Sequence, residues 1–83
     1  MKVYYCDLSG VTTKKDLFVR MLESLELEEG SASNLDALAD VIGEFRSGDT
    51  IIVYNGSALR SEMPAYYASF EKMGEDFGIR FYP

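Results

Sequence analysis

The sequence predicts a small, single α/β domain in which a three-stranded parallel sheet packs with three to four helices. Three short apolar runs, at residues 3–6, 50–54 and 79–82, have the composition of β-strands. Longer stretches between them carry apolar residues at helical spacing. Helical connections between short strands favour parallel pairing, because antiparallel neighbours need only a tight turn. The chain has 83 residues, which suits one core and one domain over residues 1–83.

The first two elements are a strand and a helix. Residues 3–6 read Val-Tyr-Tyr-Cys, and this uninterrupted apolar run predicts a buried first strand. Thr13 and Asp16 have capping-box spacing, which predicts that a helix begins at residue 14. Its apolar stripe continues to Leu25, so the predicted helix covers residues 14–25.

A second helix is predicted over residues 34–45, after an acidic and then small, polar loop. Ser33 and Asp36 repeat the capping-box spacing, with Ser33 as the predicted N-cap. The apolar residues at positions i, i+3, i+4 and i+7 form one face, and they are Leu35, Leu38, Ala39 and Ile42.

Residues 50–54 form the clearest strand, and because polar residues do not alternate in it, both of its faces are expected to be covered. Asn55 and Gly56 then predict a turn. Their position after a strand is also where α/β sheets often bind ligands, so a turn and a ligand site are both open readings.

The last part of the chain predicts one short and one long helix before the final strand. Residues 57–60 can form a single helical turn. Ser61 is the predicted N-cap of a helix over residues 62–77, with Pro64 in its first turn. Gly78 is a natural helix end, and residues 79–82 are the predicted last strand.

Charge and composition exclude several classes of function. The formal net charge is −6, from 14 acidic and 8 basic residues, which argues against nucleic-acid binding. This charge suits a basic protein partner, although acidity for solubility alone is the more common cause of such a charge. The sequence contains no histidine, which excludes histidine-based catalysis and histidine metal sites.

The single cysteine does not indicate an active site, and the sequence contains no phosphate-binding motif. Cys6 lies in a predicted buried strand and has no second cysteine to pair with, so it is expected to act as a small apolar residue. No glycine-rich phosphate loop is present, and no catalytic residue, cofactor or metal is predicted. The start of the chain is not a signal peptide and no apolar stretch is long enough for a membrane span, so the expected location is the cytoplasm.

Two aspartates on the second predicted helix are the best candidates for a binding site. Asp36 and Asp40 are four residues apart and therefore project on the same face, and Glu44 extends the stripe by one turn. Asp36 lies in the first turn, where the helix dipole favours a negative charge. Asp40 lies beyond that turn, so it gains little from the dipole, and it repels Asp36. Ala39 and Gly43 are small enough to let another surface approach. The possible interpretations are a solvated helix face, a metal-binding pair, a catalytic acid–base pair and a protein-binding site.

Residues 34–40, Asn-Leu-Asp-Ala-Leu-Ala-Asp, resemble the signature of the barstar-like family of intracellular inhibitors of secreted microbial ribonucleases. The order of predicted elements is also similar along the whole chain. The resemblance implies a barstar-like fold and an immunity protein of a bacterial toxin–antitoxin kind, and not an enzyme. It also implies a monomer that forms a one-to-one complex with a basic, extracellular-type ribonuclease or related toxin domain.

The resemblance also implies roles for individual residues. Asp40 is the expected central anion in the ribonuclease active site, and Asp36 is a second contact. Asn34 is expected to fix the loop and the helix start. The expected partner-binding set is completed by Glu44 at the helix end and by Gly30 and Ser31 in the loop.

The sequence departs from the family pattern in its aromatic residues. The family usually carries aromatic residues just before the asparagine, whereas residues 29–33 contain none. Ala39 stands where the family often has tryptophan. This departure motivates an alternative, in which the chain is an acidic protein-interaction module of the same fold with a non-ribonuclease partner.

Overall fold

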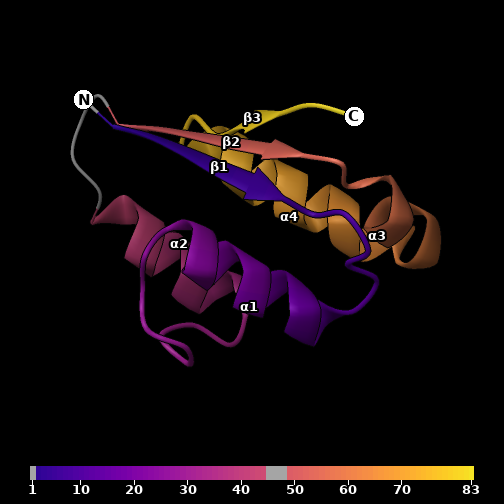
Figure 1. The fold of residues 1–83 in the computed structure, drawn as a ribbon, viewed down its shortest axis with the longest axis horizontal. Coiled ribbons are helices and arrows are strands. Elements are labelled where there is room, and N and C mark those ends of the chain that lie inside the picture. Colours follow the sequence, from indigo (N-terminus) through magenta and orange to yellow (C-terminus); the bar gives the residue numbers. More distant parts are fainter. Residues whose placement is uncertain (1, 45–48) are drawn as a thin grey trace.

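The computed structural model describes residues 2–44 and 49–83, and within them it contains three strands and four helices (Figure 1). This confirms the predicted small α/β domain with a three-stranded parallel sheet. The elements in chain order are β1 (Val3–Asp7), α1 (Lys14–Ser24), α2 (Leu35–Gly43), β2 (Thr50–Tyr54), α3 (Ser57–Glu62), α4 (Pro64–Asp76) and β3 (Arg80–Phe81).

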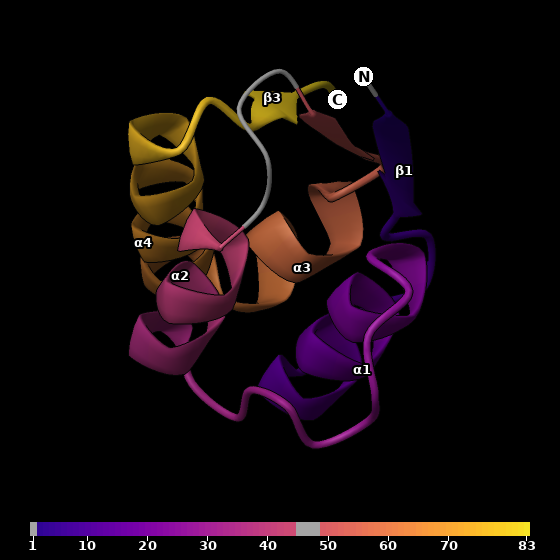
Figure 2. The ribbon, with the colours of Figure 1, turned by 90° about the vertical axis from the view of Figure 1, so that its left-hand side faces the viewer.

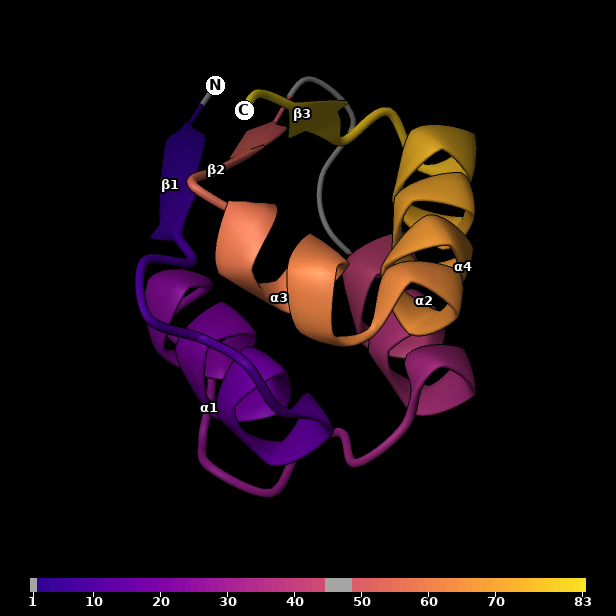
Figure 3. The ribbon, with the colours of Figure 1, turned by 90° about the vertical axis from the view of Figure 1, so that its right-hand side faces the viewer.

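The sheet has the order β1-β2-β3, so strands that follow one another in the sequence are also neighbours in space. Both pairs are parallel, with Val3 beside Thr50 and Ile52 beside Arg80. All four helices lie on one side of this sheet, as the two views at right angles to Figure 1 show (Figures 2 and 3). The domain therefore has two layers, and one face of the sheet is open.

The open face corrects two predictions about the strands. The first strand is not buried as predicted, because it lies at the edge of the sheet and leaves Val3 38% and Tyr5 62% exposed. In β2, Ile51 and Val53 are buried, whereas Ile52 is only half-buried. Side chains alternate between the two faces of a strand, so only every second residue meets the helix layer.

Of the predicted caps on the first and last long helices, one is confirmed and the other is wrong. Thr13 caps α1, and its hydroxyl oxygen accepts a hydrogen bond from the backbone N–H of Asp16 at 3.2 Å. Ser61 does not cap the last helix, because it lies inside α3. Pro64 begins α4 instead, since its fixed φ and missing N–H suit the first position of a helix.

The core fills the space between the sheet and the helix layer. Every helix contributes at least one buried side chain to it. Within residues 2–44 and 49–83, no helix has the length and apolar character needed to cross a membrane. The completely buried core residues are Cys6, Leu8, Leu17, Met21, Leu38, Val53, Leu59 and Phe70.

Candidate functional site

The helix α2 packs on α4, and its outer face is exposed to solvent (Figure 2). Its inner face buries Leu38 and Ile42. Its N-cap is Asn34, whose side-chain oxygen accepts a hydrogen bond from the N–H of Ala37 at 2.8 Å. The predicted cap, Ser33, lies one residue before the true cap.

Asn34 is therefore a positioning residue in this structure. Its side-chain oxygen is engaged with the helix, and it fixes where the first turn of α2 begins. The helix ends at Gly43 with Glu44 as C-cap. The prediction that it continues to Phe45 falls on a residue outside those that the structure describes.

Three carboxylates form what we call the acidic face, defined as Asp36, Asp40 and Glu44. All three are exposed and succeed one another at intervals of one helical turn. Among residues 2–44 and 49–83, none of the three takes part in an ion pair or a side-chain hydrogen bond. A row of carboxylates without internal cations is available to an external cation.

Local helix energetics explains only one member of the acidic face. Asp36 lies in the first turn of α2, where the positive end of the helix dipole favours an anion. Asp40 lies beyond that turn, between two other carboxylates one turn away on either side. Glu44 lies at the C-terminal end, where the dipole disfavours a negative charge. The helix itself gives no reason for the charges of Asp40 and Glu44.

The small residues Ala39 and Gly43 lie on one side of α2, and Gly43 is exposed. A Cβ atom built on Gly43 lies 3.4 Å from the ring of Phe77, just after the end of α4. Ala39 lies one turn earlier on the same side of α2. The neighbour that approaches Gly43 is therefore Phe77 of this chain.

The loop before α2 holds the other two predicted binding residues. Gly30 has φ +86, a left-handed conformation that favours glycine. Ser31 closes a turn, since its N–H and its hydroxyl both donate to the carbonyl oxygen of Glu28, at 3.1 and 2.6 Å. Both residues are exposed. They lie on the approach to α2, but the structure gives them no contact with the acidic face.

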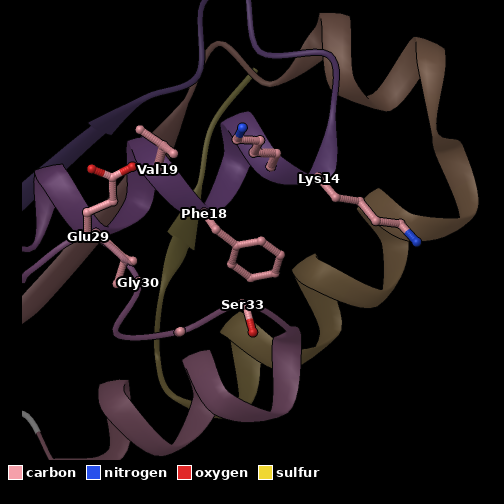
Figure 4. A pocket seen from close by; sticks show the side chains of 9 residues that line it. Lys14, Phe18, Val19, Glu29, Gly30 and Ser33 are labelled. Atoms are coloured by element: carbon pink, nitrogen blue, oxygen red, sulfur yellow. The ribbon is translucent and has the colours of Figure 1, made fainter.

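A hollow that the sequence did not indicate opens between α1 and this loop (Figure 4). Its volume is about 340 Å³. The ring of Phe18 projects from α1 toward Ser33, while Glu29 and Gly30 border the opposite end (Figure 4). The floor is apolar, formed by the buried Phe18, Leu22 and Ala32.

A second hollow of about 310 Å³ shares Lys14, Phe18 and Ser33 with the first and reaches Asp36. The two hollows adjoin at these three residues, and we call the pair the Phe18 groove; its second hollow reaches the acidic face at Asp36. The Lys14 ammonium lies 4.7 Å from the centre of the Tyr66 ring at the far wall. No sequence pattern predicts that these residues lie close together, because they belong to α1, α2 and α4 and meet only when these helices pack.

The Glu71 carboxylate of α4 is not part of the acidic face. That side chain forms an ion pair with Arg60 of α3, with a nitrogen–oxygen distance of 3.7 Å. The neighbouring Lys72 is exposed.

The ends of β1 and β2 form a second position that the sequence singled out. The Asp7 carboxylate accepts hydrogen bonds from the N–H and hydroxyl of Ser9, at 2.9 and 2.7 Å, and from the Asn55 amide at 3.0 Å. Asn55 has φ 60, and Gly56 packs directly against the buried Tyr67. Asn55 and Gly56 thus form the short connection between β2 and α3, and the side chain of Asn55 is engaged with Asp7.

The hydrogen bonds from Ser9 and then Asn55 hold the pKa of Asp7 below its usual range. A lowered pKa in the folded state stabilises the fold above the unfolded pKa of about 3.9, and this contribution is lost as the pH falls through the folded value. We therefore expect Asp7→Asn to lower the free energy of unfolding at pH 7 and to weaken its decline in acid. Asn55→Gly, which tolerates positive φ, should move the Asp7 titration toward its normal range, as carboxyl NMR can measure. An unchanged Asp7 titration in Asn55→Gly contradicts the assignment.

The only cysteine is unsuited to nucleophilic chemistry. Cys6 is completely buried, and desolvation raises the pKa of its thiol to about 11. The thiol is therefore protonated at neutral pH, and it packs as a small apolar side chain. Within the residues that the structure describes, no group of three or more acidic or cysteine side chains could hold a metal ion.

Comparison with known proteins gives one finding. A protein-family model described as Barstar (barnase inhibitor) matches residues 1–80, which is nearly the whole chain. No curated protein sequence matches the chain.

Proposed function

We propose, from the premise that this chain belongs to the barstar family, that it inhibits a basic ribonuclease by blocking the active site with the acidic face of α2. The family description names inhibitors of barnase, and inhibitors of this kind are not enzymes. The proposed partner is a barnase-type ribonuclease or a related toxin domain, bound one to one by a monomer in the cytoplasm.

The acidic face is the observation that carries this proposal. Its three carboxylates are exposed, and they lack cationic partners among the described residues. Asp36 and Asp40 are about 6 Å apart along the helix axis, since four residues rise 1.5 Å each. Two carboxylates at this spacing can occupy neighbouring phosphate-binding positions in the active site of a ribonuclease.

The mechanism is exclusion of RNA by a rigid anionic plug. Arginine and lysine side chains that bind phosphate also form charge-assisted, often bidentate bonds with carboxylates. Because α2 is capped by Asn34 and anchored through Leu38 and Ile42, its carboxylates are held in place before binding. Little conformational entropy is then lost on association.

The direct test is a titration of barnase-catalysed RNA cleavage with this protein. We expect stoichiometric loss of cleavage, with light scattering showing a one-to-one complex. The charge-reversed variant Asp40→Lys is the control, since it keeps the fold and removes the central anion. Full cleavage at a molar excess of the parent protein would count against the proposal for this class of ribonuclease.

Association should be steered by charge, which gives a second expectation. The protein carries a net charge of −6, and the proposed partner is basic. Added salt shortens the Debye length from about 30 Å at 0.01 M to about 8 Å at 0.15 M. We expect the association rate constant to fall about tenfold or more over such a range, with little change in the dissociation rate constant. Stopped-flow fluorescence can measure both, and an association rate independent of salt rules out steering.

A second candidate function follows from the loop before α2. Residues 29–33 carry no aromatic side chain, although the strongest contacts at interfaces usually include tyrosine, tryptophan or arginine. The chain can therefore be an acidic interaction module with a partner other than a ribonuclease. The two functions are separated by the cleavage assay, because only an inhibitor abolishes RNA hydrolysis by its partner.

A further inference from the structure

The Phe18 groove is continuous with the proposed interface. Its second hollow contains Ser33, Asn34 and Asp36, which lead directly into the acidic face. A partner that covers Asp36 and Asp40 therefore also covers the mouth of the groove. A side chain that this partner projects beyond Asp36, toward α1, can enter the groove.

The lining of the groove selects the chemistry of its occupant. The floor consists of the buried, apolar side chains of Phe18, Leu22 and Ala32. The rim carries two cations and two carboxylates, and these formal charges cancel. A neutral apolar group is favoured by such a site, since an ion of either sign would leave water for an apolar floor. The four rim residues are Lys14, Lys15, Glu29 and Asp36.

The size of the groove and the residues beside it indicate that its occupant is a large aromatic side chain. The first hollow, of about 340 Å³, lies at the small end of the range of ligand pockets, which suits one large side chain. The loop that forms its outer wall has no aromatic residue of its own to insert into a partner. Anchors at protein interfaces are usually aromatic side chains in pockets.

We infer that the ribonuclease seats a neutral aromatic side chain in the Phe18 groove, next to the cations that bind the acidic face. This inference rests on the proposed function, because it takes the acidic face as the centre of the interface. In this arrangement the inhibitor supplies the pocket and its partner supplies the aromatic anchor. The groove then selects among basic ribonucleases that present similar cationic clusters.

The chemistry of the groove can be tested without any ribonuclease, using N-acetylphenylalanine amide as a probe and amide NMR as the readout. We expect saturable shifts confined to the groove, around Phe18, Gly30 and Ser33. N-acetylglutamate and N-acetyllysine amides of similar size should give no saturable shift there. Equal binding of the charged probes, or no saturation with the aromatic probe, would overturn the inference.

Filling the groove tests its role in the complex. Ser33→Phe and Val19→Trp fill it from opposite walls, and neither changes the acidic face. Ser61→Phe is the matched control, because Ser61 is exposed on α3 and lines neither hollow. We expect both filling variants to weaken the complex with barnase about tenfold or more and Ser61→Phe less than threefold, with thermal unfolding confirming that all three fold.

The outcomes separate this inference from the proposed function. If the parent inhibits barnase and the filled variants inhibit it equally well, the groove is not an anchor site and the proposed function stands. If the parent does not inhibit barnase but binds the aromatic probe in the groove, the proposed function fails for this ribonuclease. The probe result then still supports the chemistry assigned to the groove.

Discussion

Replacing Asp40 by alanine is expected to weaken binding to a barnase-type ribonuclease far more than replacing Asp36. Asp40 is the middle carboxylate of the acidic face, so a cation bound there meets Asp40 and is also within reach of its neighbours. Charge pairs at protein interfaces, for which barnase and barstar are the standard example, lose about 2–5 kcal/mol when one partner is truncated. We expect Asp40→Ala to fall in that general range and Asp36→Ala to cost less.

The two substitutions should affect stability in the opposite order. Asp36 lies in the first turn of α2, so its removal forfeits about 0.3–1 kcal/mol of favourable interaction with the helix dipole. Asp40 lacks this support and repels Asp36 by about 0.2–0.5 kcal/mol, so its removal should leave the fold as stable or slightly more stable. Chemical denaturation gives the stability and calorimetric titration gives the affinity of each variant.

Glu23→Ala is a matched control, because it removes one exposed carboxylate from α1 and changes the net charge by the same amount. Its affinity should stay close to that of the parent. Equal losses for Asp36→Ala and Asp40→Ala would show that only the total charge matters. An unfolded Asp40→Ala protein would mean that the carboxylate serves the fold, and the proposed role of Asp40 would then be wrong.

The acidic face could be predicted from the sequence because it depends only on helical periodicity. Asp36 and Asp40 share a face in any α-helix, whatever surrounds it. The start of that helix was less certain, since Ser33 and Asn34 are both good N-caps. Asn34 caps α2 in the structure, so its side chain fixes the start of the helix, which is the role expected for it.

The layer arrangement and the groove could not be predicted in the same way. The parallel sheet follows from helical connections between strands, but the side on which those helices pack is a tertiary property. An apolar strand such as β1 therefore looked buried although Tyr5 is 62% exposed. The Phe18 groove needs residues from α1, the loop and α4 together, and no spacing within one element encodes that contact.

The largest stability effect that we expect outside the apolar core is that of Gly56→Ala. A Cβ atom at this position would lie 2.8 Å from two ring atoms of Tyr67, and closer still to its hydroxyl oxygen. Tyr67 is 1% exposed and contacts Phe70 edge to face, so its ring cannot move aside. We expect a loss of about 1–3 kcal/mol, as for other overpacked sites. Thermal unfolding should show it, at roughly 4–8 °C per kcal/mol for a domain of this size.

Two further variants test the cause of that loss. Gly43→Ala adds the same methyl group at an exposed helical position, where the nearest atom belongs to the 45% exposed Phe77 at 3.4 Å, so stability should be unchanged or rise by up to about 1 kcal/mol. Tyr67→Phe removes the nearest clashing atom, so it should restore part of the stability when combined with Gly56→Ala. Without such rescue, the clash with Tyr67 is not the cause. Gly56 lies between β2 and α3 and lines neither hollow of the Phe18 groove, so folded Gly56→Ala protein should retain the ribonuclease affinity of the parent although its stability falls.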